Sequence, residues 1–263
     1  MAWRCTGRTN EELVANLASA GIVQSAAVRS AMLAVDRGHF MQADDTAHVS
    51  STYHYGPYAD APQLIGHGVT ISAPHVHALA LEALAERIAT DGSRVLDVGS
   101  GSGILLGYMA TMAGIGSTIV GVEVVEPLFG QSVANLHRAG LQPGPAQHEG
   151  EAVNGASAVH GAVNGESARD APSDTAGGFG NRLIVRHGDG WEGAAELGPF
   201  DAIHVGAYAG EPPAALVRHN IYEYVRLLIH MIQCVYTRRR GKRRPRSCVP
   251  LKVSTFAAGT GRD

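Results

Sequence analysis

The stretch "RVLDVGSGSG", residues 94–103, decides the fold. Its first half is a short apolar run that predicts a buried strand. Its second half is a glycine-rich turn, in which Gly99, Gly101 and Gly103 let the backbone bend tightly and approach a ligand without Cβ clashes. The segment "ILLGYMATMAG" that follows predicts a helix. A strand, a glycine turn and a helix in this order are typical of a nucleotide-binding unit.

The same alternation continues toward the C-terminus. "STIVGVEV" at 117–124 predicts a second strand and "EPLFGQSVANLHRAG" at 126–140 a second helix. "RLIVRHGDG" at 182–190 and "PFDAIHVGA" at 199–207 predict two more strands. Strands that alternate with helices indicate an α/β fold with a parallel sheet and right-handed crossovers.

The N-terminal part is expected to be helical. A first helix should begin near Thr9, which has capping-box spacing to Glu12. Helical periodicity predicts a second helix over 25–37 and a third over 74–90. The polar, turn-rich residues 44–60 are expected to form a surface loop.

Composition excludes several classes of protein. The chain has 263 residues, 45% of them hydrophobic and 17% charged, which suits one large domain with a proper core. Its net charge of −3 makes nucleic acid an unexpected partner. Three scattered cysteines without a Cys-x-x-Cys pair, and an N-terminus without an apolar h-region, predict a cytoplasmic protein. No stretch is apolar enough for a membrane span, and a monomer is expected.

Two segments depart from the α/β pattern. Residues 141–180 are rich in small and polar residues and hold a near-repeat, "AVNGASA" and "AVNGESA", so we expect a flexible insertion. Residues 219–263 are expected to form a basic C-terminal tail after a domain at 1–218. The run "RRRGKRRPR" at 238–246 has two interpretations, a nucleic-acid or nuclear-localisation patch and a solvated tail without a role.

Acidic residues follow the strands and indicate a nucleoside-containing cofactor. Glu123 closes the second strand, where a carboxylate can accept hydrogen bonds from ribose hydroxyls. NAD and S-adenosylmethionine both fit, but Asp97 ahead of the turn would repel a pyrophosphate and suits a cationic sulfonium. Asp189 and Gly190 follow the third strand, where they could meet adenine or form an ordinary Asp-Gly turn.

The segment "VTISAPHVHA" at 69–78 holds a serine beside two histidines. Ser72 could be a nucleophile with a histidine base, or the N-cap of the helix that follows. His75 and His77 are two residues apart and do not share a helix face, so we expect no metal pair there. No other cluster has metal-ligand spacing.

Several of these motifs together resemble the protein-L-isoaspartate O-methyltransferase family. The resemblance covers residues 1–140 and 181–217 and is carried by "VDRGHF", "YADAPQLIGHGVTISAPHVHALALE", "LDVGSGSGIL", "GDG" and "DAIHVGA". It implies a Rossmann-like methyltransferase fold, with a mostly parallel sheet, helices on both faces and added N-terminal helices. It also implies methyl transfer from S-adenosyl-L-methionine to L-isoaspartyl and D-aspartyl carboxylates of damaged proteins, which starts their repair.

The resemblance assigns roles to single residues. It places the catalytic serine at Ser72. Together with the glycine-turn argument it implies these cofactor-binding residues: Val69, Thr70, Ile71, Ser72, His77, Asp97, Gly99, Gly101, Ser102, Glu123, Asp189 and Gly190. Beyond residue 218 the chain no longer resembles the family, so its C-terminal strands are expected to be missing or replaced. A catalytically impaired member and a methyltransferase for another substrate therefore remain as alternatives.

Overall fold

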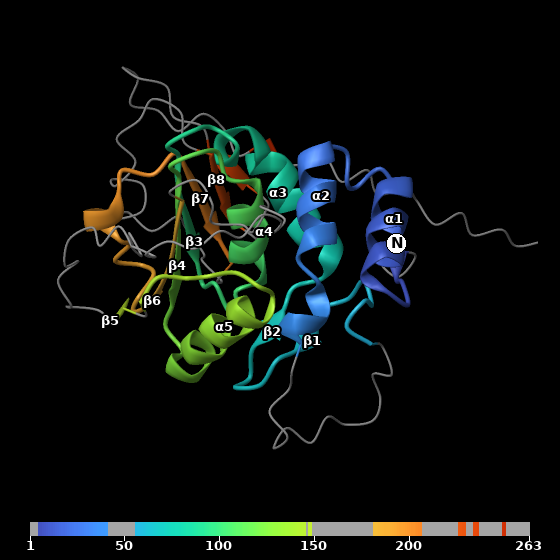
Figure 1. Cartoon of the computed structure of the whole chain (residues 1–263), viewed down its shortest axis with the longest axis horizontal. Helices are drawn as coiled ribbons and strands as arrows, with labels where there is room; N and C mark the ends of the chain where they lie inside the picture. The colour runs from blue at the N-terminus through green and yellow to red at the C-terminus, as the bar shows by residue number, and fades with distance from the viewer. Residues whose placement is uncertain are drawn as a thin grey trace, which may run out of the picture.

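A computed structural model describes residues 5–41, 56–145, 147–148, 181–206, 226–229, 234–236 and 249–250. An eight-stranded sheet forms its centre, in the order β10-β9-β8-β7-β3-β4-β6-β5 (Figure 1). Its middle strands are β3 (Arg94–Val98), β4 (Thr118–Glu123), β6 (Arg182–His187) and β7 (Ala202–Val205). They pair in parallel, which confirms the predicted strands and the α/β class.

Two helices connect the first strands as the alternation predicted. α4 (Ile104–Met112) joins β3 to β4, and α5 (Glu126–Arg138) follows β4. Leu106 of α4 lies directly over Gly121 of β4, where an added Cβ would come within 2.4 Å of the leucine Cδ1. The helix can therefore pack closely on the sheet because the strand carries a glycine at this point.

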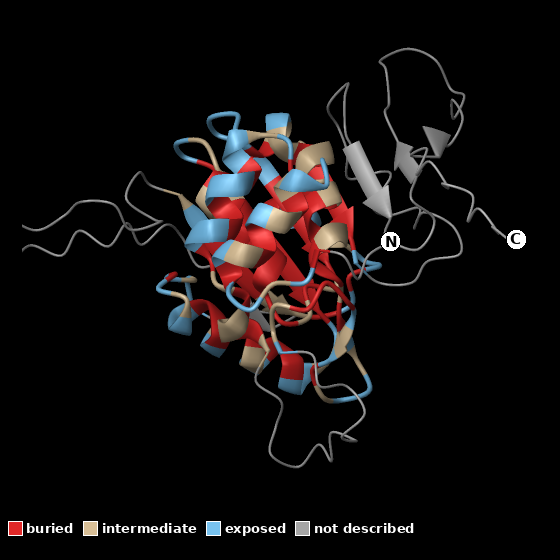
Figure 2. Ribbon diagram, turned by 90° about the vertical axis from the view of Figure 1, so that its right-hand side faces the viewer, coloured by how far each residue is buried: buried red, intermediate tan, exposed pale blue. Residues whose placement is uncertain are grey.

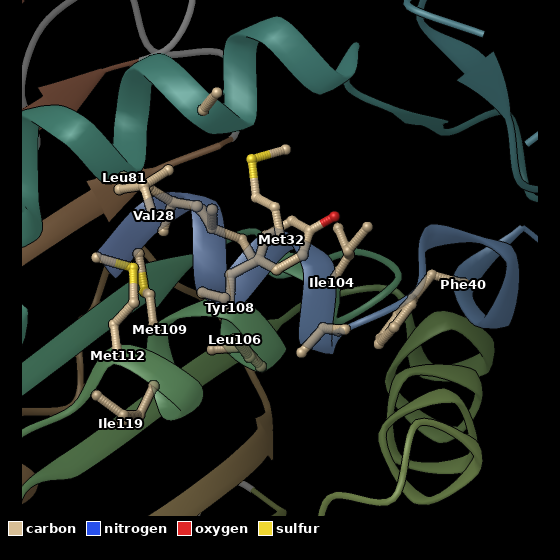
Figure 3. Close-up of a cluster of buried hydrophobic side chains, with 14 of the residues drawn as sticks. Val28, Met32, Phe40, Leu81, Ile104, Leu106, Tyr108, Met109, Met112 and Ile119 are labelled. Atoms are coloured by element: carbon tan, nitrogen blue, oxygen red, sulfur yellow. The ribbon is translucent and has the colours of Figure 1, made fainter. Parts of the chain in front are cut away.

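The three N-terminal helices are α1 (Asn10–Ser19), α2 (Ala26–Ala34) and α3 (Pro74–Ile88). Thr9 caps α1 by accepting a hydrogen bond from the Glu12 N–H (3.2 Å), as the capping-box spacing predicted. Side chains from α2, α3 and α4 meet in one apolar cluster that includes Met32, Leu81 and Tyr108 (Figure 3). The added helices therefore share one core with the sheet, which is visible as the buried centre of Figure 2.

Helices on both faces were expected, and the described part meets this only partly. The five α-helices all contribute to the apolar cluster on one face of the sheet. The other face, with Leu96 and Ile203, is covered by the short 3-10 helix η3 (Ala195–Leu197) and Phe200. The β6–β7 connection, 188–201, contains four glycines and one proline, which favours turns there over an α-helix.

Strands follow residue 218, so the expectation that the C-terminal strands are missing is wrong, and that they are replaced stays a prediction. β8 (Arg226–Ile229) pairs in parallel with β7, and β9 (Cys234–Tyr236) and β10 (Val249–Pro250) extend the sheet in antiparallel fashion. β8 covers the edge that β7 would otherwise leave unpaired. The basic run 238–246 lies outside the described residues.

Other segments differ from expectation in detail. Leu141, at the start of the expected insertion, is buried, and β5 (Gln147–His148) pairs with β6. The rest of that segment, 149–180, lies outside the described residues. In the loop expected at 44–60, Ala59 and Asp60 are fully buried, so the surface prediction is wrong at its end.

A small antiparallel pair, β1 (Gln63–Leu64) and β2 (Thr70–Ile71), leads into α3 and had not been predicted. A 3-10 helix, η2 (Arg37–Phe40), follows α2. Within the described part of the chain, no helix is long and apolar enough to cross a membrane.

Candidate active site

The predicted site residues of the glycine turn, Glu123, Asp189 and Gly190 lie where the parallel strands end. β3, β4 and β6 are neighbours, so their carboxyl ends lie at one edge of the sheet. The glycine turn at 99–103 follows β3, Glu123 ends β4, and Asp189 and Gly190 come two and three residues after β6. Ligands of open α/β sheets bind at this edge.

The glycine turn needs glycine at each of its three positions. Gly99, Gly101 and Gly103 have φ of +74°, +55° and +84°, in the left-handed region that other residues rarely adopt. A Cβ on Gly101 would meet only the Gly99 carbonyl oxygen, at 4.0 Å. The space beside Gly101 is therefore open to a ligand.

Glu123 ties the turn to the next helix. Its Oε2 accepts a hydrogen bond from the Gly101 N–H (2.8 Å), and its Oε1 accepts one from the Val125 N–H (2.9 Å) at the start of α5. The side chain is buried, with 5% exposure. A buried carboxylate is thus held at the turn, and its remaining lone pairs suit hydroxyl donors such as those of a ribose.

Asp189 and Gly190 form a tight turn after β6. The Asp189 carboxylate accepts a hydrogen bond from the Trp191 N–H (2.9 Å), so the Asp-Gly turn interpretation describes its local geometry. Gly190 packs against the end of β3, where an added Cβ would lie 2.3 Å from Val98 Cγ1. This contact holds the turn close to the strand that carries the glycine loop.

Asp97 lies beneath the glycine turn and is almost fully buried, with 1% exposure. Its Oδ1 forms a hydrogen bond with Nδ1 of His204 (2.7 Å), the residue beside it on β7. Its carboxylate is therefore engaged inside the sheet edge. His204 is a neighbour that sequence reasoning missed, although "DAIHVGA" contained it.

Ser72 precedes α3 and does not cap it. The N-cap is Ala73, without a side-chain hydrogen bond, so the N-cap interpretation of Ser72 is wrong. The nucleophile interpretation is not supported either, because within the described residues no hydrogen bond joins Ser72 Oγ to His75, whose Nδ1 is bonded to Asp60 (2.7 Å). Within the described residues Ser72 Oγ makes no hydrogen bond, and the side chain is partly exposed.

The segment around Ser72 lies beside the helix that follows the glycine turn. His77 is buried and packs edge-on against Tyr108 of α4, with 6.4 Å between ring centroids. Tyr108 is about one turn into that helix. His77, five residues after Ser72, therefore contacts the helix that follows the glycine turn.

The remaining predicted residues lie in β2, directly before it, and in the turn that leads into α4. Ile71 is buried, Thr70 is exposed, and the Val69 carbonyl accepts a hydrogen bond from the Ile65 N–H (3.0 Å). Ser102 is buried, and its carbonyl accepts a hydrogen bond from Asn135 Nδ2 (3.0 Å). The glycine turn is thereby also anchored to α5.

Two buried charged residues had been missed. The Arg37 guanidinium donates from Nε to the Pro57 carbonyl (2.9 Å) and from Nη2 to the Ser72 carbonyl (3.0 Å). The Asp60 carboxylate accepts hydrogen bonds from the His75 N–H (2.9 Å) and from its ring. Burial lowers the pKa of Arg37 to about 10, so it is protonated at neutral pH. The motifs "VDRGHF" and "YADAP" contained both residues, but nothing in them showed burial.

The arrangement fits a nucleoside cofactor with an attached cation. An open glycine turn and a buried carboxylate provide the polar groups for a ribose, and the buried Asp97 stands on β3 just before the turn. Among the described residues no group of three His, Cys, Asp or Glu side chains gathers as it would around a metal ion.

Comparison with known proteins agrees with this geometry. The family described as protein-L-isoaspartate(D-aspartate) O-methyltransferase (PCMT) matches residues 8–230, which extends the similarity past residue 218 and into β8. A Caenorhabditis elegans protein-L-isoaspartate O-methyltransferase is 37% identical over 216 residues, 82% of this chain and 75% of the relative. Protein-L-isoaspartate O-methyltransferase 1 of Arabidopsis thaliana is 38% identical over 208 residues, 79% of this chain and 71% of the relative.

A solved structure is also similar. It is that of a Plasmodium falciparum protein described as a protein-L-isoaspartate O-methyltransferase, in complex with S-adenosyl-L-homocysteine. The two chains are 28% identical with a TM-score of 0.62, and the match covers 89% of this chain and 92% of the other. The family match over most of the sequence, the relatives and the shared fold lead to one conclusion: this chain belongs to the protein-L-isoaspartate(D-aspartate) O-methyltransferase family.

Proposed function

We propose that this protein transfers a methyl group from S-adenosyl-L-methionine to the side-chain-derived carboxylate of L-isoaspartyl residues, and secondarily of D-aspartyl residues, in damaged proteins. The observation that carries the proposal is the buried Glu123 carboxylate bonded to the glycine turn, in a chain of this family. Methylation of the isoaspartyl carboxylate would initiate repair of the damaged protein.

The cofactor half of the site would be formed by residues from the turns at the sheet edge. Glu123 would accept hydrogen bonds from the ribose, and Asp189 and Gly190 would meet the adenine. His204 already engages the Asp97 carboxylate, so Asp97 would act on the cofactor through its negative charge and not through a direct hydrogen bond. The other proposed contacts are Val69, Thr70, Ile71, Ser72, His77, Gly99, Gly101 and Ser102. The cofactor, when bound, supplies a methyl group on a cationic sulfur.

The substrate half needs no general base. The attacking carboxylate has a reference pKa near ~4 and is ionised at neutral pH. The protein has to align it with the methyl group and exclude water, and good alignment is worth roughly 7–11 kcal/mol. Ser72 Oγ would donate a hydrogen bond that positions the substrate carboxylate. Its partial exposure and its lack of a hydrogen bond within the described residues support this role.

The wider context of the protein is proposed on the same basis. We propose a cytoplasmic monomer that acts on isoaspartyl-containing proteins and peptides, with residues 1–218 as the catalytic domain and 219–263 as a tail that contributes strands to the sheet. The net charge of −3 favours peptide over nucleic-acid substrates.

Methylation of two matched peptides tests the proposal. One contains an isoaspartyl residue and the other a normal aspartyl residue at the same position, and both are incubated with labelled S-adenosyl-L-methionine. Label on the isoaspartyl peptide alone is expected, and equal labelling of both would refute the proposal. Cofactor binding without any labelling would identify a catalytically impaired member. Salt-sensitive RNA binding that is lost on deletion of 238–246 would favour a different substrate.

A serine variant tests the role given to Ser72. Ser72→Ala should lower kcat for the isoaspartyl peptide by about 10-fold or more, because a positioning hydrogen bond to a charged group is worth about 1.5–3 kcal/mol. Ser30→Ala makes the same chemical change at an exposed site on α2 and is the matched control. Equal rates for the two variants would remove Ser72 from the mechanism.

A further inference from the structure

Ser72 Oγ depends on its backbone for its position. Within the described residues it makes no hydrogen bond, so no side-chain contact fixes its direction. Serine has a single side-chain torsion, and the Oγ atom lies one bond from Cβ. The backbone turn at 72–75 therefore fixes where Cβ lies and so limits Oγ to the staggered positions around it.

Two buried residues of opposite charge hold that turn from either side. Arg37 donates to the Ser72 carbonyl (3.0 Å), and Asp60 accepts from the His75 N–H (2.9 Å). Both side chains have 0% exposure. Asp60 satisfies an N–H in the first turn of α3, which Ala73 at the N-cap cannot do. The turn is thus held by groups from other segments and not by a local cap.

Arg37 is itself held rigidly. Its planar guanidinium joins two carbonyls, those of Pro57 and Ser72, which come from segments 15 positions apart. Asp36 fixes the start of η2 by accepting hydrogen bonds from the Gly38 N–H (2.7 Å) and from the Tyr58 hydroxyl (3.0 Å). The position of Ser72 is thereby connected through η2 to the core of the helical layer.

Stability alone is a poor explanation for this arginine. Within the described residues its Nε and Nη2 meet carbonyl oxygens, its buried Nη1 has no hydrogen bond, and no carboxylate forms an ion pair with it. Removing a cation from water without a contacting anion is costly, and apolar residues of similar size often stabilise a fold better. The fork geometry, which lysine lacks, fits a demand for a precise backbone position.

We propose that Arg37 is a positioning residue for methyl transfer, which fixes the Ser72 backbone so that Oγ meets the substrate carboxylate. This inference rests on the proposed function of Ser72. Arg37 touches neither substrate nor cofactor and acts through the serine. Arg37→Lys keeps the charge but can reach only one of the two carbonyls, so the turn loses part of its support.

A double-mutant cycle tests the inference. The four proteins are the unchanged chain, Arg37→Lys, Ser72→Ala and the double variant, and kcat is measured at saturating cofactor and isoaspartyl peptide. Arg37→Lys should lower kcat about 10–100-fold in the unchanged chain, since a displacement of about 1 Å can cost about 100-fold. In the Ser72→Ala background its effect should shrink to less than about 3-fold, because coupled residues are not additive.

Other outcomes overturn the inference. An equal effect of Arg37→Lys in both backgrounds would show that it acts independently of Ser72. A raised KM with unchanged kcat would show that it acts as a distant charge on peptide binding. Arg29→Lys, the same change at an exposed site on α2, is the matched control and should leave kcat unchanged.

Amide hydrogen exchange provides a readout that does not need turnover. Arg37→Lys should speed exchange in the peptide that spans 69–77 and leave β3 at 94–98 unchanged. Unchanged exchange at 69–77 would overturn the inference even if the chain proved inactive. In contrast, absence of methylation by the unchanged chain would refute the proposed function, so the two failures are distinguishable.

Discussion

Replacing Glu123 by glutamine should weaken both cofactor binding and the fold. Each carboxylate oxygen now accepts one backbone N–H, from Gly101 at 2.8 Å and from Val125 at 2.9 Å. Glutamine has the same shape but only one accepting oxygen. If that oxygen faces Gly101, its NH2 group faces the Val125 N–H, so that two donors oppose each other in a buried place.

The size of the effect follows from these two contacts. One hydrogen bond is lost and a buried donor is left without an acceptor, which costs about 1–3 kcal/mol. The other bond loses its charge assistance, which costs about 1 kcal/mol more. A total of about 2–4 kcal/mol should lower the midpoint of thermal unfolding by about 5–15 °C in a domain of this size.

Cofactor affinity should fall as well. A hydrogen bond to a charged group is worth about 1.5–3 kcal/mol, so the dissociation constant of S-adenosyl-L-homocysteine should rise about 10–150-fold. Calorimetric titration measures it below the unfolding range of the variant. Glu86→Gln, the same change at an exposed site on α3, is the control and should alter neither quantity. An affinity within about 3-fold of the unchanged chain would refute the role of Glu123 as a ribose ligand.

Three further outcomes are expected. Gly190→Ala places a Cβ 2.3 Å from Val98 Cγ1, so chemical denaturation should show a loss of about 1–3 kcal/mol, and an unchanged midpoint would contradict the packing. Burial, reinforced by the Asp60 carboxylate, raises the pKa of the Cys5 thiol above 9.0. The native protein should therefore resist alkylation of Cys5 at neutral pH. Because the folded state favours the protonated thiol, the free energy of unfolding should fall as pH rises beyond 9.0. Mass spectrometry that finds Cys5 alkylated as fast in the native protein as in denaturant would contradict this. Asp60→Asn weakens the hydrogen bonds to the His75 N–H and ring and should destabilise the fold by about 1–3 kcal/mol in denaturant unfolding, whereas an unchanged midpoint would contradict this.

The alternation of apolar strands and helices was sufficient to predict the centre of the fold. β3, β4, β6 and β7 occur where the apolar runs placed them, because buried parallel strands are recognisable as continuous apolar segments. The three glycines of the turn have the positive φ values that their spacing implied. These features are local, so a single stretch of sequence determines them.

The features that were missed depend on distant partners. Asp60 lies in a polar stretch that predicted a surface loop, yet it is buried and its partner is His75, 15 positions later. The buried Arg37 guanidinium likewise has its hydrogen-bond partners in distant loops, at the carbonyls of Pro57 and Ser72. β8 was missed because its main interaction is the pairing with β7, a contact between distant segments that the local sequence does not show. No local periodicity encodes such contacts.

The two halves of the candidate site are held by different interactions, and this separates their responses to solution conditions. Backbone hydrogen bonds and the Glu123 carboxylate shape the cofactor half, whereas the buried charges of Arg37 and Asp60 hold the Ser72 turn. Buried charges are screened far less by salt than exposed ones. Moderate salt should therefore leave kcat for a short isoaspartyl peptide almost unchanged, and any salt effect should be in KM, where the exposed charges around the peptide act. A kcat that fell steeply with salt would mean that the charges supporting Ser72 are open to solvent during turnover, contrary to their full burial.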